Sequence, residues 1–240
     1  MAGRGRQLAV PARGRGLRVR RRGDAAGPAR GARGPPRAGG RLDGGAAAGG
    51  PAVTRPPYDR PQPVLEGARV RLRPARPEDA EQVLRAVDGE YLRWTTVPEP
   101  YLPEHARTFV EEVSPAPWAQ RAGAGWVLCR PGDDAFCGAL DLRVAPEDPG
   151  RAEVGYACAP WARGEGLVPA ALVLAARWAF PALGLARLEW RAYVGNDASR
   201  RAAEKAGFRV EGLQRARLVQ RGVRRDAWVG SLLPGDLPPA

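Results

Sequence analysis

The segment 153–167 constrains this chain most; it reads Glu-Val-Gly-Tyr-Ala-Cys-Ala-Pro-Trp-Ala-Arg-Gly-Glu-Gly-Leu. It predicts a strand that passes through a loop with two glycines directly into an apolar helix. A helix that begins this way presents unpaired backbone N–H groups and the positive end of its dipole. Because Gly164 and Gly166 have no side chains, a phosphate can approach the main chain closely. The segment therefore predicts an α/β protein that binds a phosphorylated ligand.

The basic charge of the chain is concentrated in its N-terminal quarter. Residues 1–62 contain 14 Arg and 3 Asp, a net charge of 14 − 3 = +11. Residues 63–240 carry 24 Arg or Lys and 23 Asp or Glu, a net charge of 24 − 23 = +1. Inferences about acidic partners from the bulk charge therefore apply to the tail alone.

The N-terminal segment has the composition of a disordered tail. It is built mainly from Arg, Gly, Ala and Pro with a single aromatic residue, so it buries too little apolar surface to offset chain entropy. We expect a disordered tail over 1–62, one domain over 63–234 and a short C-terminal tail over 235–240. The Arg-Gly dipeptides of the tail are compatible with contact to RNA or the ribosome. However, 37 arginines against one lysine indicate a GC-rich coding bias, which favours the interpretation of a solvated tail.

Hydrophobic periodicity predicts a mixed α/β arrangement in the order β-α-α-β-β-β-α-β-α-β-β. Turn and capping signals, such as Asn196 before a helix and Gly207 after it, set several boundaries. The expected strands cover 69–73, 125–130, 136–144, 151–159, 187–194, 208–213 and 227–233. The expected helices begin at Pro77 and cover 103–113, 168–180 and the segment between Asn196 and Gly207.

The cysteines and apolar runs exclude several classes of protein. Cys129, Cys137 and Cys158 are odd in number and widely spaced, and His105 is the only histidine, so we expect no metal site. Reduced thiols in a cytoplasmic protein are the simplest interpretation. No apolar run approaches the ~18 residues that a membrane-spanning helix needs.

Two segments together resemble the GCN5-related N-acetyltransferase (GNAT) superfamily. The first is Arg163-Gly164-Glu165-Gly166-Leu167-Val168, which is similar to the family's pattern of Gln or Arg, two residues, Gly, one residue and Gly or Ala. The second, Asn196-Asp197-Ala198-Ser199 followed by Glu204-Lys205-Ala206-Gly207-Phe208, is similar to the family's "N-x-x-S…EK-x-G-F" segment. The resemblance covers residues 64–234 and is strongest to the branch that acetylates ribosomal proteins at alanine or serine.

This resemblance implies a fold, a donor and a set of binding residues. The GNAT fold is a mixed, mostly antiparallel sheet flanked by about four helices and splayed at the cofactor site. The donor is acetyl-CoA, held by loop amides at its pyrophosphate and by a strand end and an asparagine along its pantetheine arm. The binding residues implied are Ala157, Cys158, Ala159, Arg163, Gly164, Glu165, Gly166, Leu167, Val168 and Asn196.

Amine acetylation by a thioester requires loss of a proton from the amine and a proton donor for the departing thiolate. Glu153 is our first candidate for the base and Asp141 the second, although Glu153 is better explained as a strand-surface residue or a substrate anchor and Asp141 as a solvated strand residue. Ser199 is either the proton donor that the resemblance implies or a helix cap. The tyrosine that many members carry on this helix is missing.

Three aromatic residues, Tyr91, Trp94 and Tyr101, lie where the family walls the acceptor site, although Trp94 is equally well explained as core. The function expected is acetyl-CoA-dependent transfer to a primary amine, either a protein N-terminus or a small amine, without a metal. The alternative is a non-catalytic acyl-CoA sensor. A monomer and a homodimer are equally compatible with the sequence.

Overall fold

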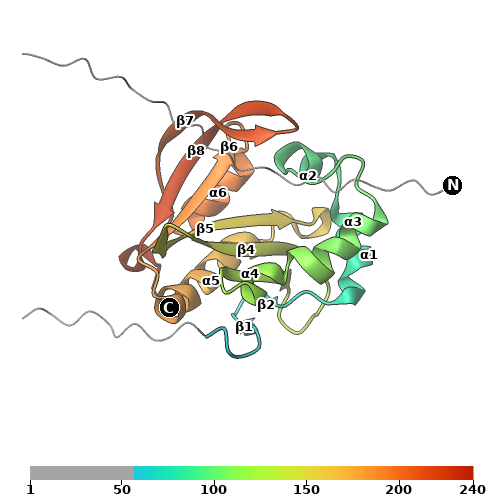
Figure 1. Ribbon diagram of the computed structural model, residues 1–240, viewed down its shortest axis with the longest axis horizontal. Coiled ribbons are helices and arrows are strands. Elements are labelled where there is room, and N and C mark those ends of the chain that lie inside the picture. The colour runs from blue at the N-terminus through green and yellow to red at the C-terminus, as the bar shows by residue number, and fades with distance from the viewer. Residues whose placement is uncertain (1–56, 240) are drawn as a thin grey trace, which may run out of the picture. The chain divides into compact units, whose positions relative to one another are not determined.

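The computed structural model describes residues 57–239, and eight strands of this part form one sheet. The sheet order is β1-β2-β3-β4-β5-β6-β8-β7, and every neighbouring pair is antiparallel except the parallel pair β5/β6 (Figure 1). The mixed, mostly antiparallel sheet that was expected is confirmed. The strands are β1 (Leu65–Glu66), β2 (Arg71–Arg73), β3 (Gly123–Cys129), β4 (Gly138–Ala145), β5 (Asp148–Cys158), β6 (Arg187–Tyr193), β7 (Arg209–Gln220) and β8 (Val223–Leu232).

Within residues 57–239, six α-helices accompany the sheet, two more than the sequence predicted. The two additional helices are short: α2 has six residues and α4 has four. The helices are α1 (Ala80–Ala86), α2 (Gly89–Trp94), α3 (Pro103–Thr108), α4 (Ala116–Ala119), α5 (Leu167–Leu183) and α6 (Asp197–Lys205). Short turns of other helix types complete the list: η1 (Pro77–Asp79), η2 (Phe109–Val113), η3 (Pro160–Ala162) and η4 (Pro234–Asp236).

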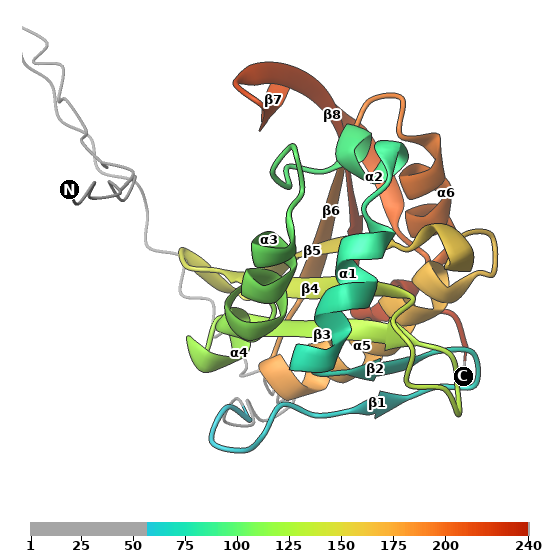
Figure 2. The same ribbon diagram turned by 90° about the vertical axis from the view of Figure 1, so that its right-hand side faces the viewer.

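The helices cover both faces of the sheet, as the alternation of β3 shows. Trp126 and Leu128 are fully buried in the larger cluster with α5, whereas Val127 and Cys129 pack with α1 and α3. Side chains alternate between the two faces of a strand, so one strand serves both cores. Figure 2 shows α1 and α3 in front of the sheet and α5 behind it, and Ala203 of α6 belongs to the same core cluster as α5.

The sheet separates between β5 and β6. The parallel pairing covers only Arg151–Val154 against Arg187–Trp190, whereas β5 stays paired with β4 as far as Cys158. The edge of residues 155–158 that faces β6 therefore has no strand partner. This separation is the splay that was expected, and it positions the site described below.

The domain extends beyond both predicted boundaries. The ring of Tyr58 lies 4.9 Å from that of Trp118, and Gln62 Nε2 donates to the carbonyl of Gly125 at 2.6 Å. At the other end Leu237 packs against the main core. Residues 57–62 were expected to be disordered, but an aromatic ring and main-chain partners hold them on the domain. The rest of the predicted tail, residues 1–56, lies outside the described residues.

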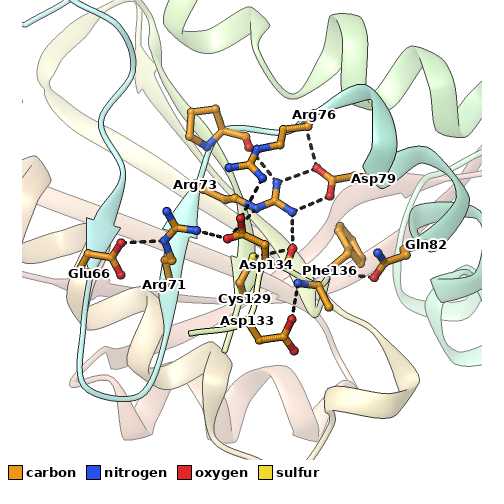
Figure 3. Close-up of polar contacts among 12 residues, drawn as sticks. Glu66, Arg71, Arg73, Arg76, Asp79, Gln82, Cys129, Asp133, Asp134 and Phe136 are labelled. Carbon is orange, nitrogen blue, oxygen red and sulfur yellow. Dashed lines mark hydrogen bonds and ion pairs between the residues drawn. The ribbon is translucent and has the colours of Figure 1, made fainter. Parts of the chain in front are cut away.

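A buried ion pair fixes the turn of the β3–β4 hairpin. Arg73, which is 2% exposed, makes two hydrogen bonds to the Asp79 carboxylate at 2.6 and 2.8 Å and one to the Asp134 carbonyl at 2.6 Å (Figure 3). Arg71 and Arg76 pair with the Asp134 carboxylate from outside. The three arginines neutralise the acids of the cluster, so its role is structural.

Candidate functional site

Two cavities meet where β5 and β6 separate. The first, about 440 Å³, lies over the loop before α5 and is called the loop cavity. The second, about 320 Å³, lies over the middle of β4, β5 and β6 and is called the sheet cavity. Seven residues line both cavities and mark the junction: Tyr91, Trp94, Thr95, Tyr156, Ala157, Asn196 and Ser199.

The loop cavity has the features of an anion site. Gly164 and Gly166 have φ angles of +82° and +77°, a conformation that side chains rarely adopt, and Gly166 precedes the first residue of the 17-residue helix α5. A Cβ added at Gly164 would meet nothing within 4 Å, so the loop is open to the cavity. The charged residues that line it are Glu90, Arg163, Arg201 and Lys205, a net positive set.

Arginines brace this loop from outside the cavity. Arg69 Nη2 donates to the Glu165 carbonyl at 3.1 Å, and Arg130 donates to the Glu165 carboxylate at 2.7 and 2.9 Å. The hydrogen bonds from Arg130 lower the pKa of Glu165. Glu165 therefore points toward Arg130, and it is not among the residues that line the loop cavity.

Arg163 ties the loop to α2. Its guanidinium makes two hydrogen bonds to the Asp88 carboxylate, at 2.7 and 2.8 Å, and lowers the pKa of that carboxyl. Asp88 also caps α2 by accepting from the Tyr91 N–H at 2.8 Å. One carboxylate thus joins the loop cavity to a wall that both cavities share.

The open end of β5 lies along the loop cavity. Ala157 and Cys158 line the cavity, while Ala159 is fully buried and donates its N–H to the Cys137 carbonyl at 2.9 Å. Burial raises the pKa of the Cys158 thiol to about 11, so the thiol is neutral at pH 7. The first two residues of α5, Leu167 and Val168, and the cap Asn196 complete the predicted set on this cavity.

Ser199 lies at the junction within a network of hydrogen bonds. Trp190 Nε1 donates to Ser199 Oγ at 3.1 Å, and the hydroxyls of Tyr156 and Ser199 are 2.9 Å apart. The Tyr156 hydroxyl also lies 2.9 Å from the Ser199 carbonyl, which can only accept. The simplest assignment is that Tyr156 donates to this carbonyl and Ser199 donates to Tyr156. Burial raises the pKa of Tyr156 to about 12, so the phenol stays protonated.

The sheet cavity contains two carboxylates in different environments. Glu153 contacts two guanidinium groups, with Arg191 at 2.8 Å and Arg143 at 3.5 Å. Asp141 pairs with Arg143 alone, and burial raises the pKa of Asp141. A Cβ at Gly155 would lie 2.7 Å from Asp141 Oδ1, so glycine at this position leaves room for the carboxylate.

The predicted aromatic residues separate into two groups. Tyr91 and Trp94 line both cavities, and Trp94 Nε1 donates to Glu90 at 2.8 Å. Tyr101 lines neither cavity; it packs against the core under α1 and α3, with its ring 5.5 Å from His105. The sequence placed all three on one connection, but the turn that contains Pro98 and Pro100 directs Tyr101 elsewhere.

Within residues 57–239, no group of three or more His, Cys, Asp or Glu side chains could hold a metal ion. In the same part of the chain, no helix has the length and apolar character needed to cross a membrane. All three cysteines are free thiols.

Comparison with known proteins agrees with this geometry. Residues 69–209 match the acetyltransferase (GNAT) domain family. The chain is 31% identical over 172 residues to the "Putative ribosomal N-acetyltransferase YdaF" of Bacillus subtilis, covering 68% of this chain and 91% of that protein. It is 27% identical over 172 residues to the "Uncharacterized N-acetyltransferase YoaA" of the same organism, covering 71% and 97%.

A solved structure is similar over the same region. The RimJ protein of Mycobacterium smegmatis, in complex with CoA-disulfide, aligns with a TM-score of 0.62 at 26% identity, covering 71% of this chain and 85% of that one. The chain therefore belongs to the GNAT acetyltransferase family, and it is an N-acetyltransferase. The expected resemblance to the ribosomal-protein branch is confirmed.

Sequence reasoning missed the partners of its own candidates. Tyr156 was read as a strand residue, yet its hydroxyl contacts Ser199, which lies 43 positions further along the chain. Arg143 and Arg191 were not connected with Glu153, because ion pairs between strands depend on register. The only signal in the sequence was that both residues lie in neighbouring predicted strands. The observed register then places Arg143 opposite Glu153 in the β4–β5 pair.

Proposed function

We propose that the protein transfers an acetyl group from acetyl-CoA to a primary amine, with the donor in the loop cavity and the amine in the sheet cavity. The observation that carries this proposal is the junction of the two cavities at the open edge of β5. A donor and an acceptor that enter from opposite sides can meet there without passing each other. Holding the two reactants next to each other replaces a bimolecular encounter with an effectively unimolecular step, which lowers the entropic part of the reaction barrier.

The loop cavity fits coenzyme A, which carries three phosphate groups. The N-terminal amides of α5 and the side chains of Arg163, Arg201 and Lys205 supply donors and positive charge at one end of the cavity. The main chain of residues 164–168 would hold the pyrophosphate. The free edge of Ala157 and Cys158, with Asn196 opposite, would hold the pantetheine arm. When bound, the donor supplies an acetyl group already activated as a thioester.

Asp141 is the better placed of the two candidate bases. It pairs with Gly155, next to the junction residue Tyr156, whereas Glu153 lies two residues further from the junction on the same strand. The carboxylate of Glu153 is already engaged by two guanidinium groups, those of Arg143 and Arg191. Asp141 pairs with the single guanidinium group of Arg143, and burial raises the pKa of Asp141, which favours this carboxylate as the proton acceptor. Glu153 then orients Arg143 and Arg191 around the acceptor.

Ser199 would stabilise and protonate the departing thiolate. Tyr156 would hold the Ser199 side chain in position. The Ser199 hydroxyl is the side-chain donor at the junction that can turn from Tyr156 toward the cavity. Trp190 Nε1 fixes the serine oxygen while the hydroxyl hydrogen turns. Tyr156 thus supplies, from β5, a phenol that the α6 helix lacks. The alternative of a non-catalytic sensor rested on that missing phenol and on a carboxylate missing near Arg217 and Leu218, and Tyr156 supplies only the phenol.

The acceptor proposed is the N-terminal amine of a protein. The name of YdaF points to a ribosomal protein, and the open mouth of the sheet cavity is compatible with a chain that leads away from the amine. Tyr91 and Trp94 would wall this acceptor.

The test is acetyl transfer from acetyl-CoA to a panel of N-terminal peptides and a panel of small amines, followed by mass and by thiol release. The expected result is acetylation of at least one peptide at its N-terminal amine, lost on Asp141→Asn. Acetylation of small amines alone would reject the protein acceptor. Turnover on neither panel would reject the transfer reaction, even if acetyl-CoA binds.

A further inference from the structure

Two segments that each contribute uncharged residues to the lining of the sheet cavity have opposite net charge. Residues 212–228, called the basic arm, contain five arginines and one aspartate, a net charge of 5 − 1 = +4. Residues 88–117, called the acidic wall, contain six carboxylates and two arginines, a net charge of 2 − 6 = −4. Residues 63–240 as a whole carry only +1, so neither value reflects the average composition of the domain.

Both segments border the same cavity. The acidic wall contributes residues such as Tyr91, Val97 and Phe109 to the cavity lining, and the basic arm contributes Leu218. The arm is the outer half of the β7–β8 hairpin, which ends the sheet on the side of α2 (Figures 1 and 2).

The tip of the arm is anchored to the wall. Gln220 Nε2 donates to the carbonyls of Arg93 and Thr95 at 2.8 and 3.0 Å, and Arg221 pairs with Glu99 at 2.8 Å. The arm is therefore held beside the cavity mouth rather than projecting freely.

Most arginines of the basic arm have no carboxylate partner. Arg221 is paired, but the other four are exposed and form no ion pair within residues 57–239; they are Arg215, Arg217, Arg224 and Arg225. Arg225 lies opposite the cavity residue Leu218 in the β7–β8 register. Burial raises the pKa of Tyr193, another residue of the cavity lining, and the nearby charges of Arg221 and Arg225 oppose this rise.

We propose that the acceptor is a peptide whose N-terminal amine is followed by several Asp or Glu residues, which the basic arm binds. The proposal rests on the proposed function and adds a substrate class to it. The ammonium group of such a peptide is attracted to the acidic wall and to Asp141, while its carboxylates pair with the guanidinium groups of the arm that have no carboxylate partner. A polyamine or a lysine-rich peptide presents positive charge to the arm and is repelled. Charges at the rim of a site act mainly on encounter rate and KM, and salt weakens them.

The test uses three peptides of equal length that share an N-terminal Ala and differ at the next five positions, which are Glu, Gln or Lys. We expect kcat/KM for the Glu peptide to exceed that for the Gln peptide about tenfold at low ionic strength, mainly through KM. The Lys peptide should be the poorest, and the three values should converge at high salt.

A charge-reversed arm and a matched control make the test specific. Arg215→Glu with Arg225→Glu leaves the anchors Gln220 and Arg221 in place and should remove the preference for the Glu peptide. Arg60→Glu with Arg85→Glu changes the net charge equally at exposed positions elsewhere, and this variant should retain the preference. The shift in unfolding temperature with acetyl-CoA, measured for all variants, reports whether the donor site is intact.

Each outcome separates this proposal from the function on which it rests. Equal acetylation of the Glu and Gln peptides would overturn the acidic acceptor while the transfer reaction stands. Equal loss of preference in the control variant would also overturn it, because net charge rather than the arm would be responsible. Retention of RNA by the wild-type protein but not by the arm variant, without any peptide preference, would assign the arm to RNA instead.

Discussion

The loop cavity and the sheet cavity are built from different materials. The loop cavity is formed mainly by main chain: two glycines with positive φ, the first turn of α5 and the free edge of β5. The sheet cavity is lined by side chains from separate strands and from the segment around α2, and its charged residues are held in ion pairs such as Arg191–Glu153. Main-chain geometry is set by local sequence, whereas ion pairs across strands are set by the whole fold.

The largest expected effect distinguishes the two carboxylates of the sheet cavity. Asp141→Asn should lower kcat/KM about 100-fold, the range typical of a lost general base. Glu153→Gln should cost less, because its carboxylate is already paired with Arg143 and Arg191. Steady-state kinetics on one peptide would measure both variants. A greater loss in Glu153→Gln than in Asp141→Asn would reverse the assignment.

A smaller effect is expected at the junction of the cavities. Tyr156→Phe removes the hydroxyl that contacts Ser199 and should lower kcat on the order of tenfold, with little change in donor KM. Because the two side chains act as a unit, Tyr156→Phe should have little further effect in a Ser199→Ala background. Additive losses in the double variant would show that the two hydroxyls act independently.

The free energy of unfolding should depend on pH in a way that reflects the titration of Asp141. Burial raises its pKa in the folded state, so the folded state binds this proton more tightly than the unfolded chain does. The stabilising contribution is fully present below the unfolded pKa of ~3.9 and is lost as the pH rises through the folded value. In urea unfolding across this range, the wild type should lose stability relative to Asp141→Asn as the pH rises. If the difference in unfolding free energy between the wild type and Asp141→Asn did not change with pH, the raised pKa of Asp141 would be contradicted.

The smallest effect concerns the link between the cavities. Asp88→Asn keeps the oxygen that caps α2 but removes the charge that pairs with Arg163. Because this pair is more than a third exposed, solvent screens it, and the change in unfolding free energy should be at most about 0.5 kcal/mol. If the link positions the shared wall, acceptor KM should rise while donor affinity is unchanged. An equal loss of donor affinity would place the role of Asp88 in the loop cavity instead.

Sequence reasoning succeeded where structure is local. The glycine loop, the long helix α5 and the cap Asn196 with the Ser199 N–H follow from contiguous residues, and the structure contains all of them. The strands β7 and β8 are much longer than predicted. The prediction ended them early because the arginine-rich hairpin lacks an apolar alternation. In the structure, main-chain pairing holds the hairpin together. The roles proposed for Tyr156, Arg143 and the basic arm depend on contacts across the sheet. A single sequence does not specify which residues make those contacts.

The donor site is tested most directly by heat unfolding of the full chain with and without acetyl-CoA. Gly164→Glu is compared with Gly132→Glu, because both glycines have positive φ, +82° and +74°, and a Cβ at either meets nothing within 4 Å. Backbone strain therefore costs both variants about the same, but only Gly164 lines the loop cavity.

At about 100 times the dissociation constant, acetyl-CoA should stabilise the wild type and Gly132→Glu by ~2.7 kcal/mol and leave Gly164→Glu unchanged. Equal stabilisation of all three proteins, or of none, would contradict donor binding at this loop.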